Sequence, residues 1–213
     1  MYEKGKGETV VMFTAILDLG IGNLRSIRRG LEFAGAKTKI TSASKDLSKA
    51  DSIVLPGVGA FEDAVKNLKP LKETLFEEIS SGKPVLGICL GMQLMFEEST
   101  EGGLYKGLGI FKGKVVRFPK LEGLKIPQMG WNSLEILKKD PIIEGIEDDS
   151  YVYFVHSYYP NSEERAVAKT SYGVDFPSIV SKNEQIFATQ FHPEKSGKIG
   201  LKILENFVKI IKR

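Results

Sequence analysis

Residues 84–93, which read Pro-Val-Leu-Gly-Ile-Cys-Leu-Gly-Met-Gln, constrain the fold more than any other part of the chain. Residues 85–88 form a short apolar run entered through a proline, and such a run is typical of a buried strand. Residues 92–98 are predicted to form a helix that buries apolar side chains. Cys89, the only cysteine, therefore falls on a sharp turn between a strand and a helix, which favours an α/β fold.

Cys89 lies between Gly87 and Gly91, and this pattern matches a nucleophile elbow with cysteine in place of serine. We expect the glycines to let the backbone bend tightly and to leave room for a substrate beside the sulfur. The N-terminus of the following helix would favour the thiolate, because its N–H groups and dipole stabilise negative charge. Most lone cysteines are small buried hydrophobic residues, and the elbow alone does not decide between the two roles.

The composition limits the class of protein. The 213 residues are enough for one large α/β domain, and 42% hydrophobic with 27% charged residues is usual for a globular protein. A net charge of +3 without a basic stripe argues against nucleic acid, and no apolar run approaches the roughly 20 residues that cross a membrane. The start does not resemble a signal peptide and one cysteine cannot form an internal disulfide, so we expect a cytoplasmic protein. The spacing of the two histidines and the cysteine predicts no metal site, and no cofactor is expected.

The other predicted elements are helices and strands that alternate through the first half of the chain, followed by a second half rich in strands. Strands are expected over residues 10–17, 37–41, 52–55, 151–158, 166–170, 178–181 and 185–191, with a β-ribbon over 107–119 and further β-structure over 125–137. Helices are expected from about residue 23 to 33 and over 61–68, 71–80 and 198–212.

Two glycine-rich turns follow predicted strands. The Gly20-x-Gly22 pair is a weak dinucleotide-binding signal, because Arg25 stands where a third glycine belongs. The second turn, over residues 56–59, is Pro-Gly-Val-Gly at the end of a predicted parallel strand, at the sheet edge where ligands bind in α/β folds. Beside a nucleophile elbow, such a loop can supply an oxyanion donor, although alone it is better interpreted as an ordinary turn.

His192-Pro193-Glu194 at the end of a predicted strand is the third chemical group. A cysteine nucleophile needs a base, and the base needs a carboxylate to fix its tautomer. Pro193 restricts the turn, so Glu194 can return to the imidazole of His192. An elbow cysteine, an oxyanion loop and a His-x-Glu pair together are far more specific than any one of them. His156 is the other candidate base, but a hydrogen-bonded structural histidine is the commoner case on a half-buried strand.

Residues 87–93 together with Phe-His-Pro-Glu at 191–194 resemble the class I glutamine amidotransferase family, and the resemblance covers residues 12–213. Three further segments narrow it to the glutaminase subunits of imidazole glycerol phosphate synthase, from histidine biosynthesis: residues 56–59, 129–132 and 153–158. Most relatives carry a Gly-Gly pair in the oxyanion loop, where this branch has a valine. We therefore expect residues 1–11 to be a flexible tail and residues 12–213 to be the glutaminase domain.

The resemblance implies a mostly parallel central sheet flanked by helices, with an antiparallel accessory sheet, and the predicted strands agree. It implies a heterodimer with the cyclase subunit, a (β/α)8 barrel, and L-glutamine as substrate. Cys89 would attack the glutamine side-chain amide, His192 would move the proton to the leaving ammonia, and Glu194 would orient His192. The remaining implied residues are oxyanion donors at Gly57, Val58, Gly59 and Leu90, glutamine ligands at Gln93, Glu101, His156, Ser157 and Tyr158, and docking residues at Trp131, Tyr153 and Lys195.

Two other functions stay open at this point. The glutaminase of pyridoxal phosphate synthase has the same triad, but the Met-Gly-Trp-Asn segment at 129–132 argues against it. A noncatalytic regulatory module on the same fold would use Cys89 to sense redox state or to bind a small ligand. The intact pair of His192 and Glu194 argues against a regulatory module, because a protein without turnover needs neither a base nor a group to orient it.

Overall fold

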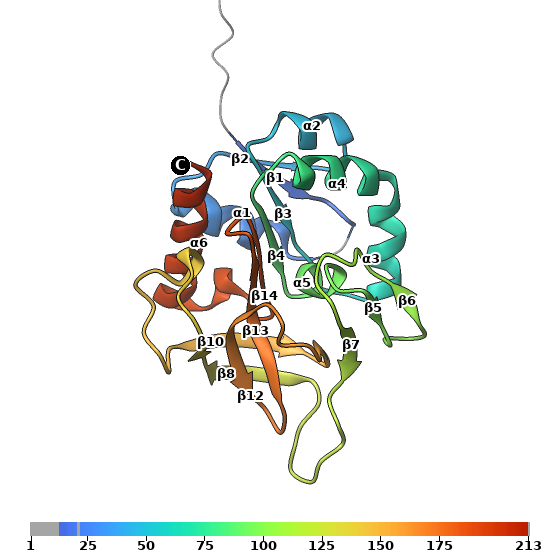
Figure 1. The fold of residues 1–213 in the computed structure, drawn as a ribbon, viewed down its shortest axis with the longest axis vertical. Coiled ribbons are helices and arrows are strands. Elements are labelled where there is room, and N and C mark those ends of the chain that lie inside the picture. Colours follow the sequence, from blue (N-terminus) through green and yellow to red (C-terminus); the bar gives the residue numbers. More distant parts are fainter. Residues whose placement is uncertain (1–12, 21, 213) are drawn as a thin grey trace, which may run out of the picture.

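The computed structural model describes residues 13–20 and 22–212 (Figure 1). The predicted tail over residues 1–11 and the first part of the predicted strand over 10–17 lie outside these residues. A mixed eight-stranded sheet runs through the molecule, with parallel pairing from its first to its fifth strand and antiparallel pairing beyond. In spatial order its strands are β2 (Thr38–Thr41), β1 (Thr14–Leu17), β3 (Ser52–Leu55), β4 (Val85–Ile88), β14 (Ile186–Thr189), β13 (Asp175–Lys182), β12 (Ala166–Ser171) and β9 (Glu135–Ile136).

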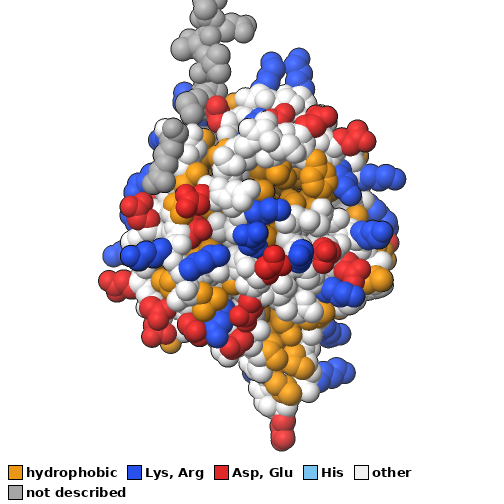
Figure 2. Space-filling model, viewed as in Figure 1, with side chains coloured by type: hydrophobic (Ala, Val, Ile, Leu, Met, Phe, Trp, Pro, Cys, Tyr) orange, Lys and Arg blue, Asp and Glu red, His pale blue; other side chains and the backbone are white. Residues whose placement is uncertain are grey.

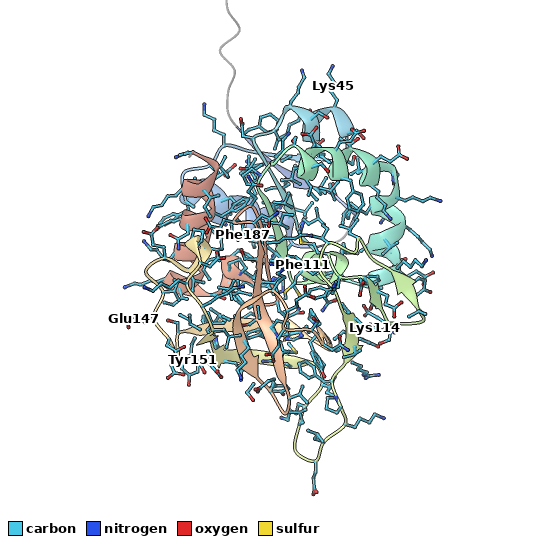
Figure 3. All side chains as sticks on the ribbon, in the orientation of Figure 1. Lys45, Phe111, Lys114, Glu147, Tyr151 and Phe187 are labelled. Atoms are coloured by element: carbon cyan, nitrogen blue, oxygen red, sulfur yellow. The ribbon has the colours of Figure 1, made fainter. Side chains whose placement is uncertain are left out.

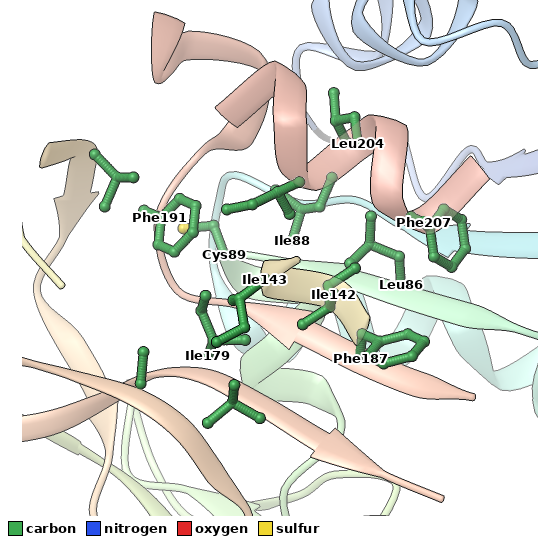
Figure 4. Close-up of a cluster of buried hydrophobic side chains, with 14 of the residues drawn as sticks. Leu86, Ile88, Cys89, Ile142, Ile143, Ile179, Phe187, Phe191, Leu204 and Phe207 are labelled. Atoms are coloured by element: carbon green, nitrogen blue, oxygen red, sulfur yellow. The ribbon is translucent and has the colours of Figure 1, made fainter. Parts of the chain in front are cut away.

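Helices cover both faces of the parallel part of this sheet (Figure 1). One face carries α1 (Leu24–Phe33) and α6 (Gly197–Ile211), and the other carries α2 (Ser44–Lys49), α3 (Phe61–Leu68), α4 (Lys72–Ser80) and α5 (Leu90–Leu94). Successive strand residues point to opposite faces, so Leu86 and Phe187 join one core while Val85 and Ala188 join the other. Figure 4 shows the first core, where Leu204 and Phe207 of α6 lie over the sheet.

Two small sheets accompany the large one, and in Figure 1 β8 and β10 lie beside its strands β12 and β13, with β5 and β6 at the right. The first pairs β8 (Gln128–Ser133) with β10 (Tyr151–His156), and the second has the order β11 (Tyr158–Pro160), β7 (Lys114–Arg117), β5 (Glu98–Ser99) and β6 (Tyr105–Lys106). Short 3-10 helices are η1 (Lys69–Leu71), η2 (Pro141–Ile143) and η3 (Pro193–Lys195). The predicted fold class is confirmed, with the accessory β-structure divided into two sheets that include one parallel pair, β5 with β7.

The predicted bounds of β3, β4 and α3 agree with the structure, most other elements differ by one to three residues at an end, and the strand predicted over 151–158 is divided into β10 and β11. Two further predictions were wrong in extent by more than this. The helix after Cys89 begins at Leu90 and ends at Leu94, because the chain turns and enters β5 only a few residues later. The predicted ribbon over 107–119 contains only the strand β7, since Gly109 and Gly113 have φ angles of 67° and 110° in the preceding loop. The six-residue helix α2 was not predicted.

Charged side chains of both signs are interspersed over the face that Figure 2 shows, and no large region of one sign stands out there. Hydrophobic side chains gather on the projection at the bottom of this view, where the loop between β7 and β8 lies. In Figure 3, Phe187 lies in the interior of the molecule and Tyr151 at its periphery. None of the helices over residues 13–20 and 22–212 is long and apolar enough to cross a membrane.

Candidate active site

Cys89 occupies the turn between β4 and α5, with backbone angles φ 52° and ψ −106°. A positive φ is uncommon for a residue other than glycine, and such strain concentrates at functional sites. The turn is held from both sides, because the Cys89 N–H donates to the Thr189 carbonyl at 2.7 Å and the Cys89 carbonyl accepts from the Gln93 N–H at 3.1 Å. The sharp strand-to-helix turn predicted from the sequence is therefore present, and the cysteine is only 5% exposed.

The two glycines beside Cys89 serve packing. A Cβ atom on Gly91 would lie 1.9 Å from the carbonyl oxygen of Leu55, and one on Gly87 would lie 2.9 Å from the carbonyl oxygen of Gly91. Neither glycine lines the cavity in front of the sulfur. The expectation that they leave room for a substrate was wrong, since the space they free is taken by the close approach of α5 to the strands beneath it.

His192 follows β14, the strand beside β4 in the sheet. Its Nδ1 lies 2.8 Å from Oε1 of Glu194, and both side chains are buried. Its Nε2 is also buried and has no well-aligned hydrogen bond among the described residues. Burial alone lowers the pKa of His192, but the interactions with Cys89 and then with Glu194 outweigh this effect and raise that pKa to about 10. The interactions with the Cys89 sulfur and the Glu194 carboxylate therefore favour the charged form of the imidazole.

A cavity of about 280 Å³ opens in front of Cys89, a volume at the lower end of the range for small-molecule sites. Besides Cys89, it is lined by the five predicted glutamine ligands, Gln93, Glu101, His156, Ser157 and Tyr158, and by Val58, Gly59 and Leu90 from the predicted oxyanion set. Pro127 and Val155, which the sequence analysis did not single out, complete its wall. The structure therefore gathers residues from four separate parts of the chain around one thiol.

A carbonyl in the loop after β3 occupies one of the predicted oxyanion donors, the N–H of Leu90 in α5. The Leu90 N–H donates to the carbonyl oxygen of Gly57 at 3.3 Å, so this N–H is already occupied. Val58 is not among the residues with positive φ, whereas Gly59 has φ 136°. A Cβ atom on Gly22 would lie 3.4 Å from the Val58 nitrogen, so this glycine lies beside the loop that faces the nucleophile.

His156 is a neutral buried histidine in the wall of the cavity. Its Nδ1 lies 2.8 Å from the Tyr158 carbonyl oxygen, and because a carbonyl only accepts, Nδ1 carries the hydrogen. The ring packs among Phe118, Phe154 and Phe176, with centroid distances of 5.2, 5.6 and 5.2 Å. Burial lowers the pKa of His156 to about 4. His156 thus bonds to a backbone carbonyl, whereas His192 bonds to the carboxylate of Glu194.

Glu101 is the acidic group of the cavity. Its Oε2 accepts the N–H of Phe61, the first residue of α3, at 3.1 Å, and burial raises the pKa of the Glu101 carboxyl. Over the described ranges, no group of three or more His, Cys, Asp or Glu side chains is placed to hold a metal ion. The chemistry that this arrangement supports is nucleophilic attack by sulfur with a histidine to move protons.

A chain of amide groups connects the cavity wall with the sulfur. Nε2 of Gln93 donates to the Tyr158 carbonyl at 2.8 Å and to Oε1 of Gln190 at 3.3 Å. Nε2 of Gln190 in turn lies 3.7 Å from Sγ of Cys89, and Gln190 is 0% exposed. Gln190 was not predicted, although its position two residues before His192, which directly follows the strand expected over residues 185–191, was a signal that both side chains face the same side.

The outer surface of the two-stranded sheet formed by β8 and β10 is apolar and exposed. Trp131 stands opposite Tyr153, with ring centroids 5.9 Å apart. The exposed fractions are 53% for Trp131, 64% for Met129 and 60% for Tyr151. We call this surface the β8–β10 face. Lys195, the third predicted docking residue, is exposed in η3. The β8–β10 face adjoins the site, because the Tyr153 carbonyl accepts the backbone N–H of His192.

The family model of class I glutamine amidotransferases matches residues 15–211 of this chain. The chain is 54% identical over 197 residues to the imidazole glycerol phosphate synthase subunit HisH of Methanocaldococcus jannaschii, covering 92% of this chain and 98% of the relative. It is 50% identical over 200 residues to the HisH subunit of Archaeoglobus fulgidus, covering 93% and 99% of the two chains.

Solved structures show the same fold at low sequence identity. A crystal structure of a glutamine amidotransferase covers 94% of this chain and 99% of its own, with a TM-score of 0.73 and 18% identity. The glutaminase domain of Trypanosoma brucei CTPS, solved with bound acivicin, covers 94% of each chain with a TM-score of 0.68 and 16% identity. From the family match and the two relatives, the chain belongs to the class I glutamine amidotransferase family and, within it, to the HisH subunits of imidazole glycerol phosphate synthase.

Proposed function

We propose that this chain hydrolyses L-glutamine to glutamate and ammonia and passes the ammonia to the cyclase subunit of imidazole glycerol phosphate synthase. The observation that carries the proposal is Cys89, with its strained backbone, in the wall of a small cavity, together with the buried pair of His192 and Glu194 after the neighbouring strand. The similarity to HisH subunits supports the same reaction and its place in histidine biosynthesis.

The thiolate of Cys89 attacks the carbon of the glutamine side-chain amide, and the electron pair of the C=O bond moves to oxygen. The imidazolium of His192 gives its proton to the leaving nitrogen as the tetrahedral intermediate collapses to a thioester and ammonia. A water molecule then gives a proton to the neutral imidazole and attacks the thioester, which releases glutamate and restores the thiol group. Glu194 keeps the ring oriented and stabilises its charged form, in agreement with the raised pKa of His192.

The cavity offers groups that match the polar end of glutamine. Both amide hydrogens of Gln93 are used within the protein, so its Oε1 is the atom left to accept a hydrogen bond from a substrate ammonium group. The Glu101 carboxylate supplies negative charge for the same ammonium group. Ser157 and Tyr158 form the opposite wall at the corner between β10 and β11, and the neutral ring of His156 supports this corner through its bond to the Tyr158 carbonyl.

The partner in this proposal is the cyclase subunit, a (β/α)8 barrel that forms a heterodimer with this chain. The β8–β10 face supports this assignment, because aromatic and methionine side chains like those exposed on it are enriched at the centres of protein interfaces. Trp131 and Tyr153 would contact the barrel, with Lys195 beside the route by which ammonia leaves. A catalytic free thiol fits the reducing cytoplasm, where we place the reaction.

We further propose that the oxyanion loop is at rest in this structure. The N–H groups of Leu90 and of the Gly57–Gly59 loop would hold the negative oxygen of the intermediate, but the Gly57 carbonyl now occupies the Leu90 N–H. Rotation of the peptide between Gly57 and Val58 would remove this carbonyl and turn the Val58 N–H toward the cavity. Binding of the partner and of its nucleotide substrate would favour the rotated loop, which makes the coupling allosteric.

The test is a Cys89→Ala variant assembled with the cyclase subunit. It should release no glutamate from glutamine, yet the complex should still form product from free ammonium, because ring closure belongs to the partner. Retained glutamine hydrolysis would contradict the assignment of Cys89. Trapping of Cys89 by an electrophilic glutamine analogue tests the regulatory-module alternative, since a module without turnover would not form this adduct.

A further inference from the structure

We infer that Gln190 is a positioning residue for the proposed nucleophile: its side-chain amide donates a hydrogen bond to the Cys89 sulfur and favours the thiolate. The inference rests on the proposed glutaminase function, for which the thiolate is the attacking species. It concerns a residue outside the triad, the oxyanion loop and the predicted glutamine ligands. Gln190 is completely buried, so its amide has no solvent to bond with in place of its protein partners.

The orientation of the Gln190 amide follows from its neighbours. The Tyr158 carbonyl can only accept, so the atom of Gln93 that lies 2.8 Å away must be its nitrogen. The same nitrogen lies 3.3 Å from the next amide, so the Gln190 atom that it meets must be an oxygen. The remaining atom of Gln190, 3.7 Å from Sγ of Cys89, is therefore an N–H donor. A backbone carbonyl thus fixes, through two side chains, a donor that points at the sulfur.

Val155 and Gln190 each contact the sulfur, and the two contacts favour different protonation states. Sγ of Cys89 lies 3.8 Å from the Val155 carbonyl oxygen, which can accept a hydrogen bond from the thiol but disfavours a negative sulfur. The N–H of Gln190 favours the negative sulfur, because hydrogen bonds to a charged acceptor are stronger than those to a neutral one. The amide of Gln190 therefore works with the imidazolium of His192 against the carbonyl.

Two variants separate this donor role from packing. Gln190→Glu keeps the length of the side chain and an oxygen that accepts from Gln93, but it presents a second oxygen to the sulfur. Gln190→Met keeps the approximate volume and presents no donor. Ser178→Ala is the matched control, since Ser178 is equally buried, its hydroxyl has no hydrogen-bond partner among the described residues, and its backbone carbonyl still accepts from the Gln190 N–H.

The measurement is the rate of alkylation by iodoacetamide against pH on the full chain, which reports Cys89 alone because the chain has one cysteine. The pH of half-maximal rate should rise by about one unit in Gln190→Met, since a hydrogen bond to a charged group is worth about a tenfold change, and by more in Gln190→Glu. In the complex with the cyclase, kcat for glutamine hydrolysis should fall about tenfold in Gln190→Met, with KM changed much less. Ser178→Ala should match the wild type in both assays.

An unchanged pH midpoint in Gln190→Glu would overturn the inference, and lost activity with an unchanged midpoint in both variants would assign Gln190 to packing only. Thermal unfolding of each variant shows whether the chain is folded, and the alkylation profile of Gln190→Met still decides the matter if Gln190→Glu does not fold. Failure of the proposed function gives a different result. In that case the wild-type complex would release no glutamate, whereas the alkylation profiles would still differ between wild type and variants.

Discussion

Replacing Val58 with glycine should raise the glutaminase rate of the isolated chain. In the resting loop, the Gly57 carbonyl occupies the Leu90 N–H, and Val58 does not have a positive φ. Rotation of the peptide between residues 57 and 58 frees that N–H, but it drives φ of residue 58 toward positive values. A β-branched residue resists this region and glycine does not, so Val58→Gly removes part of the cost of reaching the active loop.

The size of the effect follows from two costs. The absence of one oxyanion donor lowers turnover by about 10²–10³, and the resting loop leaves two donors unavailable, so it can withhold at least this much activity. A residue other than glycine pays about 1–2 kcal/mol to enter the left-handed region, and 1.4 kcal/mol is a factor of about ten. Val58→Gly should therefore raise the basal rate about 5- to 30-fold. The stimulation by the nucleotide-loaded partner should shrink by the same factor, because in the active complex the loop is already rotated and the substitution does not raise its rate further.

The assay is steady-state glutamate release by the free chain, by its complex with the cyclase, and by the complex with nucleotide. Val58→Ala is the matched control, because it removes the two methyl groups but keeps the Cβ atom that opposes a positive φ. Its basal rate should stay much closer to the wild type than that of the glycine variant. Equal basal rates in Val58→Gly and Val58→Ala would refute the reasoning, as would equal turnover of the wild type in all three states.

Three further predictions concern other parts of the molecule. His192→Ala should lose glutamine hydrolysis nearly as completely as Cys89→Ala, because the two residues act as a unit, whereas His156→Ala should mainly raise KM. A larger loss of kcat in His156→Ala than in His192→Ala would show that the base is misassigned. The pKa of His156 is about 4 in the folded chain, against 6.5 for an ordinary histidine, so the unfolded chain binds the proton first as the pH falls. About 3 kcal/mol of the free energy of unfolding should therefore be lost between pH 6.5 and pH 4. Urea unfolding across this range should show a smaller loss in His156→Gln, and equal losses would contradict the buried neutral ring. Trp131→Ala should weaken cyclase binding about 30-fold in a titration without changing the unfolding midpoint of the free chain, whereas Phe33→Ala, at an exposed residue of α1, should leave binding unchanged.

The elements predicted with correct bounds are those whose signals are local. The strand β4 is a continuous apolar run, and α3 carries Phe61, Ala64 and Leu68 at helical spacing along its buried side. The helix α2 gave no such signal, because it has six mostly polar residues and its N-cap, Ala43, makes no side-chain hydrogen bond. The loop before β7 was mistaken for a strand because its shape depends on a distant contact, since a Cβ atom on Gly107 would lie 2.2 Å from the Phe96 carbonyl oxygen.

The same distinction holds at the site. Cys89 and the contact between His192 and Glu194 were predicted from short motifs, in which the spacing itself carries the geometry. The occupied N–H of Leu90 was not predicted from the residues, because its partner is a backbone carbonyl and no side chain records the contact. The role of Gln190 was not predicted, because its spacing from His192 indicates only the side that it faces, whereas the orientation of its amide depends on Gln93 in α5.

The pairing of β4 with β14 makes the contact between the thiol and the histidine depend on a long-range step of folding. Four residue pairs, from Val85 with Ile186 to Ile88 with Thr189, hold the two strands side by side, and the residues they join are far apart along the chain. Closing so long a loop is entropically costly, so pairings of this kind form after local structure. Until these strands meet, the thiol has no histidine beside it, and an incompletely folded chain holds a cysteine that cannot consume glutamine.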